Sequence, residues 1–381
     1  MINRDNRAQG AKGAAEMKVL ILSGQFGLGH IAAARALAEQ LQTSGLVERV
    51  TIADLYETAF PGCGEIFCRG YGALISHSGR LLNLAYKKTV HSEQEHDFGL
   101  FGRYAGLRLG QLLAGTRPDL IISTYSLAAR LVADYLRRQG LRIPHIVCIT
   151  DIGVHHIWLN PGVDLFLAAA PETRDSLLAC GVAAERVAVS GIPVKSCFQP
   201  GLARATENKR CELLVMGGGL GLLPKDMSLL AALDNLPGLR TTVICGRNKA
   251  LYRRLYGQFC RIEIIGFTER VPDYMRRASL MLSKPGGVSM FEAIISELPL
   301  LIFPPALDQE LANAGFLQAR GMARLLPQES AAAAALIAEL AADSAAQQAM
   351  AGRMRDFRRE LDEQALLRYV RLLKDRAGRA A

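Results

Sequence analysis

The sequence predicts an α/β protein made of two doubly wound, Rossmann-like domains that face each other across a cleft. Short apolar runs alternate with helical stretches in two successive series, and such alternation is typical of parallel sheets covered by helices. In addition, a chain of 381 residues with 50% hydrophobic residues exceeds what a single core usually holds. The two series therefore indicate two domains.

Changes in composition predict the domain boundaries. Residues 1–16 are small and polar, without the apolar segment of a signal peptide, and are expected to form a disordered extension. A first domain over residues 17–195 is followed by a polar, irregular linker at 196–210. Residues 211–381 are assigned to the second domain, which includes a long helical tail.

The composition narrows the possible partners and the compartment. The net charge of +9 is spread along the chain, and no nucleic-acid motif accompanies it, so an anionic membrane surface is a better match than nucleic acid. The eight cysteines lack C-x-x-C spacing and indicate reduced thiols in a cytoplasmic protein. No apolar run is long enough to span a membrane, and no set of residues has metal-ligand spacing.

The first predicted strand, Met17–Ser23, ends in a glycine-rich turn that leads through Gly29 and His30 into an alanine-rich helix. The glycine spacing does not fit G-x-G-x-x-G, which disfavours a dinucleotide site. His30 lies at the carboxyl edge of the sheet, where α/β proteins bind ligands, and its side chain titrates near neutral pH. It is therefore a candidate general base, and the alternative is a packing or capping histidine.

Another predicted strand of the first domain, His145–Ile149, ends in a loop that carries Asp151, His155 and Trp158. Without further ligands at fixed spacing, this loop indicates a polar pocket wall and not a metal site. The remaining strands of this domain are expected at Val50–Ala53, Asp119–Ser123, Asp164–Ala170 and Val187–Ser190.

The segment from Phe60 to Gly115 mixes basic residues with apolar and aromatic ones. It is consistent with a surface that inserts its apolar side into lipid and offers cations to head groups. Ordinary helices with one buried face explain the same composition equally well.

The second domain repeats the arrangement of strand, glycine turn and helix. Its first strand, Glu212–Met216, ends in Gly217, Gly218 and Gly219, and the strand Thr241–Cys245 is followed by Gly246 and Arg247. The remaining strands of this domain are expected at Ile262–Ile265, Leu280–Ser283, Leu298–Phe303 and Ala323–Leu326, and a helical tail is expected from Ala331 to about Ala377.

The stretch from Ser283 to Asn313 is the strongest candidate for a binding site. A strand enters a helix through Lys284, Gly286 and Gly287, and a helix N-terminus with glycines attracts anions such as phosphate. Glu292 follows one turn later, where its carboxylate could accept hydrogen bonds from a ribose. Gln309 and Asn313 are suited to sugar hydroxyls. The alternative is a tight turn followed by a solvated glutamate.

Taken together and in order, these motifs resemble one family of glycosyltransferases of the GT-B fold. It comprises the bacterial processive diacylglycerol β-glucosyltransferases and the monogalactosyldiacylglycerol synthases. The resemblance covers the chain from Lys18 to about Gly321. It is carried by Gly27 to Ala34, Thr150-Asp151 with His155 to Trp158, Gly191 to Val194, Cys245 to Asn248, Lys284 to Gly287, Glu292, Gln309, Glu310 and Asn313.

The resemblance implies transfer of a hexose, with inversion, from UDP-glucose or UDP-galactose to diacylglycerol or a glycosylated diacylglycerol. It implies no tightly bound cofactor and no metal, with the UDP-sugar as co-substrate, on the inner face of the cell membrane. His30 and Asp151 would be catalytic. Acceptor binding would fall to Gly29, His155 and Trp158, and donor binding to Gly217, Gly218, Gly219, Arg247, Lys284, Gly286, Gly287, Glu292, Gln309 and Asn313.

Two departures from the family pattern affect the donor sugar. Leu220 stands where some members have an acidic residue, and Leu307-Asp308 stands where many have Pro-Gly. The hexose therefore cannot be transferred from the resemblance. A polyprenyl-linked acceptor, a UDP-sugar epimerase and a binding protein without activity are the alternatives.

Overall fold

A computed structural model of the chain describes residues 17–24, 28–62, 99–200, 211–224, 226–305 and 307–380, except for the side chains of 99–101 and 380. Three predicted features lie partly or wholly outside these residues: the N-terminal extension at 1–16, residues 201–210 of the linker, and residues 63–98 of the segment that mixes basic and apolar side chains. Residues 25–27 of the first glycine turn also lie outside them.

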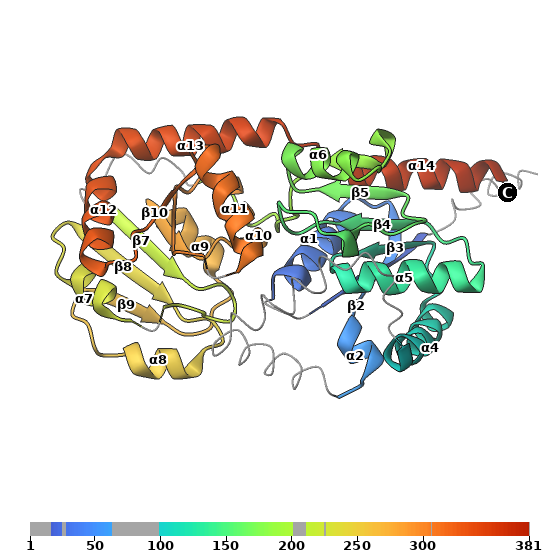
Figure 1. Cartoon of the computed structure of the whole chain (residues 1–381), viewed down its shortest axis with the longest axis horizontal. Coiled ribbons are helices and arrows are strands. Elements are labelled where there is room, and N and C mark those ends of the chain that lie inside the picture. The colour runs from blue at the N-terminus through green and yellow to red at the C-terminus, as the bar shows by residue number, and fades with distance from the viewer. Residues whose placement is uncertain are drawn as a thin grey trace, which may run out of the picture.

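The first domain is a parallel six-stranded sheet in the order β2-β1-β3-β4-β5-β6, with helices on both faces (Figure 1). The strand that holds Leu20, Ile21 and Leu22 lies between two others, and it is a continuous apolar run whose three residues are fully buried because both faces of the sheet are covered. Its strands are β1 (Met17–Ser23), β2 (Val47–Asp54), β3 (Leu120–Ser123), β4 (His145–Cys148), β5 (Leu165–Ala168) and β6 (Val187–Val189). Its helices are α1 (Gly29–Thr43), α2 (Leu55–Ala59), α4 (Gly99–Thr116), α5 (Ser126–Gln139) and α6 (Pro171–Ala179), with short 3₁₀ turns η1 (His156–Trp158) and η2 (Ala184–Arg186).

The second domain is another parallel six-stranded sheet, in the order β12-β11-β10-β7-β8-β9. Its strands are β7 (Cys211–Met216), β8 (Leu239–Ile244), β9 (Ile262–Ile265), β10 (Leu280–Ser283), β11 (Leu300–Ile302) and β12 (Ala323–Leu325). Its helices are α7 (Ser228–Asp234), α8 (Lys249–Leu255), α9 (Val271–Arg277), α10 (Gly287–Ile295), α11 (Asp308–Ala319), α12 (Ser330–Ala342) and α13 (Ser344–Arg359). Two such sheets confirm the predicted fold class.

The helical tail predicted within the second domain consists of three helices, α12, α13 and α14. It breaks at Asp343, whose carboxylate caps α13 by accepting from the Ala346 N–H, and again after Arg359. The last helix, α14 (Ala365–Ala380), buries Leu366 and Val370 in the core that α1 and β1 form. Figure 1 shows α13 running from the second domain toward the first, and α14 lying beside β5 and α6. The predicted second domain, 211–381, therefore wrongly includes α14, because this helix packs on the first domain.

The two domains share a buried apolar interface. Ala33, Ile152 and Ile192 of the first domain lie in the same cluster as Val288 and Phe291 of α10. Association of the domains therefore removes apolar surface from water, which favours the closed arrangement.

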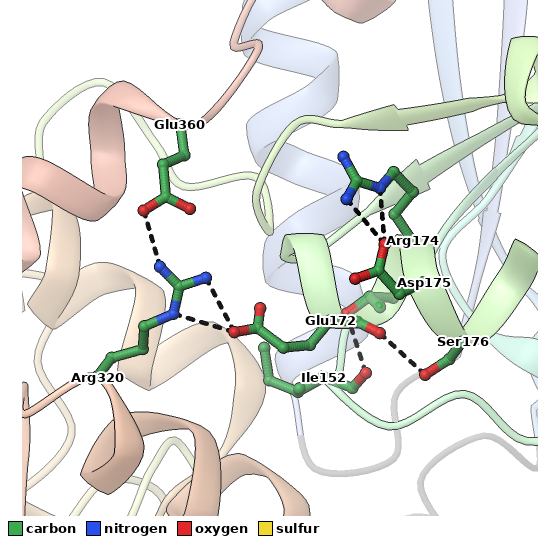
Figure 2. A network of polar contacts seen from close by, with 8 residues as sticks. Ile152, Glu172, Arg174, Asp175, Ser176, Arg320 and Glu360 are labelled. Atoms are coloured by element: carbon green, nitrogen blue, oxygen red, sulfur yellow. Dashed lines mark hydrogen bonds and ion pairs between the residues drawn. The ribbon is translucent and has the colours of Figure 1, made fainter.

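An ion-pair network borders this interface (Figure 2). Arg320, at the end of α11, lies 2.9 Å from a carboxylate oxygen of Glu172 in α6 and 2.7 Å from one of Glu360 at the end of α13. One guanidinium thus joins the first domain to the second and to the tail that returns to the first.

Within the described part of the chain, no helix combines the length and the apolar character needed to cross a membrane.

Candidate active site

A cleft of about 770 Å³ lies between the two domains, and the loops that follow the strands of both sheets line it. This is the edge at which open parallel sheets bind ligands. It brings together thirteen of the predicted site residues: Gly29, His30, Asp151, Gly217, Gly218, Gly219, Arg247, Lys284, Gly286, Gly287, Glu292, Gln309 and Asn313. His155 and Trp158 do not line it.

His30 stands at the start of α1 and reaches the cleft from the first domain. Its Nδ1 lies 2.8 Å from the hydroxyl oxygen of Thr150, and the ring of Tyr125 lies 5.0 Å away, centroid to centroid. Burial lowers the pKa of His30 to about 4, against a smaller opposing effect of the Thr124 backbone. The imidazole is therefore neutral near pH 7 and able to accept a proton.

The residue before α1 brings the first domain against the second. Leu28 adopts a left-handed backbone conformation, with a φ of 63°, which is uncommon for a residue with a branched side chain. This conformation lays its side chain against Gly219, where an added β-carbon would lie 2.7 Å from Leu28 Cδ1. The absence of a side chain at Gly219 thus allows the two walls to meet at this side of the cleft.

Asp151 is a buried carboxyl on the first-domain wall, 6% exposed. Burial raises its pKa to about 6, Glu310 raises it further, and hydrogen bonds from Gln309 and Asn313 act in the opposite direction. Its partners all come from α11 of the second domain, so Asp151 is held across the interface.

Asn313 is predicted to contact the sugar, but its side-chain amide is bonded to other groups of the protein. It is 1% exposed, and its amide nitrogen donates to the Pro285 carbonyl oxygen at 2.9 Å and to Asp151 Oδ1 at 3.3 Å. Its amide oxygen accepts from the Ile152 N–H at 3.0 Å. Because these bonds use both ends of the amide, the structure makes Asn313 a link between the domains and leaves Gln309 as the sugar candidate on α11.

The paired glycines before α10 have separate surroundings. Gly286 is the N-cap of α10, no side chain caps the helix there, and an added β-carbon at Gly286 would meet nothing within 4 Å. At Gly287 an added β-carbon would overlap the Thr150 carbonyl oxygen of the first domain. Gly286 therefore leaves space at a helix N-terminus, which suits an anion, whereas Gly287 allows the domains to approach.

Glu292 lies on the same helix and lines the cleft. Burial raises its pKa to about 8, and the nearby charge of Lys195 lowers it by a smaller amount. A desolvated carboxyl of this kind needs hydrogen-bond donors, and ribose hydroxyls would supply them.

The glycine run after β7 packs against the loop after β8. An added β-carbon at Gly221 would overlap the Cys245 carbonyl oxygen, and the Arg247 N–H donates to the Gly219 carbonyl oxygen at 3.0 Å. Gly218 has a φ of 68°, a conformation that glycine adopts without strain. Close packing of the two loops explains these glycines before any ligand is considered.

The cationic side chains of the second-domain wall differ in how they are paired. Lys284 forms an ion pair with Glu310, with 2.6 Å between Nζ and Oε1. Arg247 is exposed, and its guanidinium lies over the ring of Phe267 at 5.5 Å. Arg247 is thus the better placed of the two to meet a phosphate, because the charge of Lys284 is already matched.

The predicted acceptor residues His155 and Trp158 do not line the cleft. Trp158, on η1, is 1% exposed and packs with Val147 and Phe166 in a core cluster, so its assignment to acceptor binding is wrong. The ring of His155 lies 5.8 Å from that of Trp158, and burial lowers its pKa to about 4.

Sequence reasoning missed Thr150 and Phe267. Thr150 enters the family motif only as the neighbour of Asp151, and its place at the carboxyl end of β4 is the signal that points to it. Among the described residues, no group of three or more His, Cys, Asp or Glu side chains is placed to hold a metal ion.

Comparison with known families decides what kind of protein this is. Residues 30–194 match the family described as monogalactosyldiacylglycerol (MGDG) synthase, and residues 213–365 match the glycosyltransferase family 28 C-terminal domain. With one such match on each domain, the chain is a glycosyltransferase whose second domain matches family 28. The resemblance read from the motifs is thereby confirmed.

Curated relatives of this glycosyltransferase carry a common name. The processive diacylglycerol β-glucosyltransferase of Bacillus subtilis (strain 168) is 29% identical over 318 residues, which are 80% of this chain and 82% of the relative. The protein of the same name from Bacillus cereus (strain G9842) is 28% identical over 325 residues, 82% of this chain and 83% of the relative.

Solved structures agree on the GT-B fold. MurG of Acinetobacter baumannii superposes with a TM-score of 0.64 at 18% identity, over 94% of this chain and 99% of that one. The spinosyn rhamnosyltransferase SpnG, in complex with thymidine diphosphate, gives a TM-score of 0.61 at 17% identity, over 93% of this chain and 100% of that one. A UDP-N-acetylglucosamine 2-epimerase superposes with a TM-score of 0.58 at 13% identity, over 95% of this chain and 97% of that one.

Proposed function

We propose that this glycosyltransferase moves a glucose or galactose unit, with inversion, from a UDP-sugar to diacylglycerol or a glycosylated diacylglycerol. The observation that supports it best is a neutral imidazole, His30, on one wall of the cleft and an open helix N-terminus at Gly286 on the other. A base and an anion site facing one cavity are what this transfer requires. The names of the Bacillus relatives supply the acceptor class.

The chemistry assigns one step to each wall. His30 takes the proton of the acceptor hydroxyl while that oxygen forms a bond to the anomeric carbon. The bond between the anomeric carbon and the diphosphate oxygen breaks, and its electron pair leaves with UDP. The charge that grows on the diphosphate meets the N–H groups at the start of α10 and the guanidinium of Arg247. Attack from the side opposite the leaving group inverts the anomeric centre.

The other residues of the second-domain wall hold the donor in this proposal. Glu292 accepts hydrogen bonds from the ribose, and Gln309 contacts the hexose. The glycine turn at 217–219 lets the nucleotide lie close to the backbone. Asp151, buried beside Gln309 and Asn313, shapes the acceptor side and acts through its charge. No tightly bound cofactor and no metal ion takes part in the proposed reaction.

A lipid acceptor calls for contact with a membrane, and we place the enzyme on the cytoplasmic face, at an anionic surface. On α4, Leu107 is 61% exposed and Tyr104 44% exposed, with Arg103 exposed beside them. Apolar and cationic side chains on one helix suit the boundary between head groups and acyl chains.

The proposal is tested by incubating the purified full chain with labelled UDP-glucose or UDP-galactose and vesicles that contain diacylglycerol. Lipid extraction followed by mass spectrometry should show a hexosyl-diacylglycerol, and the preferred nucleotide identifies the hexose. Vesicles containing a polyprenyl-linked sugar in place of diacylglycerol form the second arm. Product in that arm alone would reject diacylglycerol as the acceptor.

A UDP-sugar epimerase is the second candidate, because a UDP-N-acetylglucosamine 2-epimerase shares the fold. It would convert UDP-N-acetylglucosamine in buffer without vesicles. Such conversion, with no lipid product in either vesicle arm, would replace the proposed function. Binding of UDP with neither epimerisation nor sugar transfer would indicate a binding protein without activity.

A further inference from the structure

The side chain of His30 contacts the hydroxyl of Thr150, which has no role in the proposed transfer. Thr150 is 3% exposed, and its Oγ1 lies 2.8 Å from His30 Nδ1. A neutral imidazole carries a single N–H, so Nε2 can accept a proton only when that hydrogen is on Nδ1. The Thr150 hydroxyl can donate to a bare Nδ1 or accept from an Nδ1–H, and in the second arrangement it stabilises this tautomer and also the imidazolium formed after proton uptake.

The loop that carries Thr150 is bonded to the second domain. Asn313, on α11, accepts from the Ile152 N–H at 3.0 Å and donates to Asp151 Oδ1 at 3.3 Å. The same amide group donates to the Pro285 carbonyl oxygen at 2.9 Å. One buried side chain thus ties the loop beside the base to the turn that opens α10.

Two further contacts remove the remaining freedom of this loop. Thr173, on α6, donates to the Ile152 carbonyl oxygen at 2.9 Å, so both backbone polar groups of Ile152 are bonded. The Thr150 carbonyl lies against Gly287, with no room for a β-carbon between them. The position of Thr150 relative to the anion turn is therefore fixed only while the two domains are together.

We propose that Thr150 is a positioning residue that holds His30 with its hydrogen on Nδ1, and that Asn313 fixes the Thr150 loop to the anion turn. The base is then aligned only in the closed arrangement of the domains. A donor that binds at Gly286 and keeps the domains closed would thereby prepare His30 for the acceptor. This inference rests on His30 being the base of the proposed transfer.

The tautomer can be observed without any enzyme assay. Protein labelled with ¹⁵N-histidine has seven histidines, and the His30→Ala variant identifies the signals of His30. Long-range ¹H–¹⁵N spectra at neutral pH should show His30 protonated at Nδ1. In Thr150→Val the population should shift toward the form protonated at Nε2, and Thr150→Ser should restore it. A wild-type His30 protonated at Nε2, or an unchanged spectrum in Thr150→Val, would overturn the inference.

The kinetic test separates turnover from binding. Thr150→Val should lower kcat by about 10- to 100-fold, since it removes alignment but not the base, with KM for the UDP-sugar within about twofold of wild type. Thr150→Ser should recover most of the loss. A KM effect without a kcat effect, or equal losses in both variants, would contradict the positioning role.

Asn313 is tested by comparing its two possible roles. As a link between loops, Asn313→Ala should lower kcat while UDP and the UDP-sugar bind with the same relative affinity as in wild type. As a sugar contact, it would weaken binding of the UDP-sugar and not of UDP, and that result would refute the link. If Asn313→Ala does not fold, the Thr150 pair still decides the inference.

These outcomes are distinct from those of the proposed function. Absence of any glycolipid product would reject the proposed function while the tautomer measurement still stands. Loss of turnover in His30→Ala together with normal turnover in Thr150→Val would keep the base and reject the positioning role.

Discussion

The two walls of the cleft are built from the same kind of element, a loop at the carboxyl end of a parallel strand, yet they differ in chemistry. The first-domain wall presents ionisable groups removed from water: His30 with its pKa lowered to about 4 and Asp151 with its pKa raised to about 6. The second-domain wall presents glycines, a helix N-terminus at Gly286 and the exposed cation Arg247. Proton transfer is suited to the first wall and anion binding to the second.

This difference has a consequence for how the site is assembled. Neither wall contains both a base and an anion site, so the residues that connect the walls matter as much as those that react. Gly287, Gly219 and Asn313 connect them, by allowing close approach or by bonding across the interface. Variants of the walls should therefore affect either turnover or donor binding, whereas variants of the connections should affect both walls.

The largest effect is expected from removing the base. His30→Ala should lower kcat by about 10²- to 10⁴-fold, the usual contribution of a general base. The control is His155→Ala, which removes a second, partly buried histidine that does not line the cleft and should keep most of the activity. Both are measured as glycolipid formed per minute under saturating donor. Equal losses in the two variants would show that His30 has no special role.

The paired glycines give the next largest effect and the sharpest contrast. Gly287→Ala introduces a methyl group where the Thr150 carbonyl lies, and overpacking of this kind costs about 1–3 kcal/mol. Its thermal midpoint and its turnover should both fall. Gly286→Ala has open space and should keep the thermal midpoint but bind UDP more weakly. Equal thermal midpoints for Gly287→Ala and Gly286→Ala would contradict the claim that Gly287 allows the domains to approach.

The buried carboxyl of Glu292 predicts a pH effect on stability. Burial raises its pKa from 4.5 to about 8, so the folded protein holds this proton more tightly than the unfolded chain does. The associated stability is complete below about pH 4.5 and is lost as the pH rises through about 8. Glu292→Gln cannot ionise, and its free energy of unfolding should rise relative to wild type across that window.

Urea denaturation at about pH 5 and about pH 8.5 measures this difference. The matched control is Ser289→Ala on the same helix, which changes no ionisable group and should give a difference that does not depend on pH. A pH-independent difference for Glu292→Gln as well would mean that Glu292 is not desolvated.

The smallest effect is expected at the edge of the interface (Figure 2). Arg320→Ala removes the ion pairs to Glu172 and Glu360, and partly exposed pairs are worth about 1 kcal/mol or less. The control Arg174→Ala removes a pair with Asp175 that lies within α6. Only Arg320→Ala should increase domain opening, measured as proteolysis between the domains. An equal increase in proteolysis for Arg174→Ala would show that Arg320 does not help to hold the domains together.

The sequence predicted the sheets well because buried parallel strands are continuous apolar runs, as in Met17–Ser23. It could not distinguish Gly286 from Gly287, because the distinction depends on which atoms of the other domain face each glycine. The fate of Trp158 was also set by long-range packing, and no local pattern signalled it. The sequence predicted a helical tail but not that its last helix, α14, would pack on the first domain.

The central claim is that the two walls act separately, one on the acceptor proton and one on the donor. Calorimetric titration of UDP into the His30→Ala variant tests it most directly, with wild type titrated under the same conditions. The account predicts the same affinity for UDP in both proteins, although His30→Ala forms almost no product. A loss of UDP affinity in parallel with the loss of turnover would contradict it.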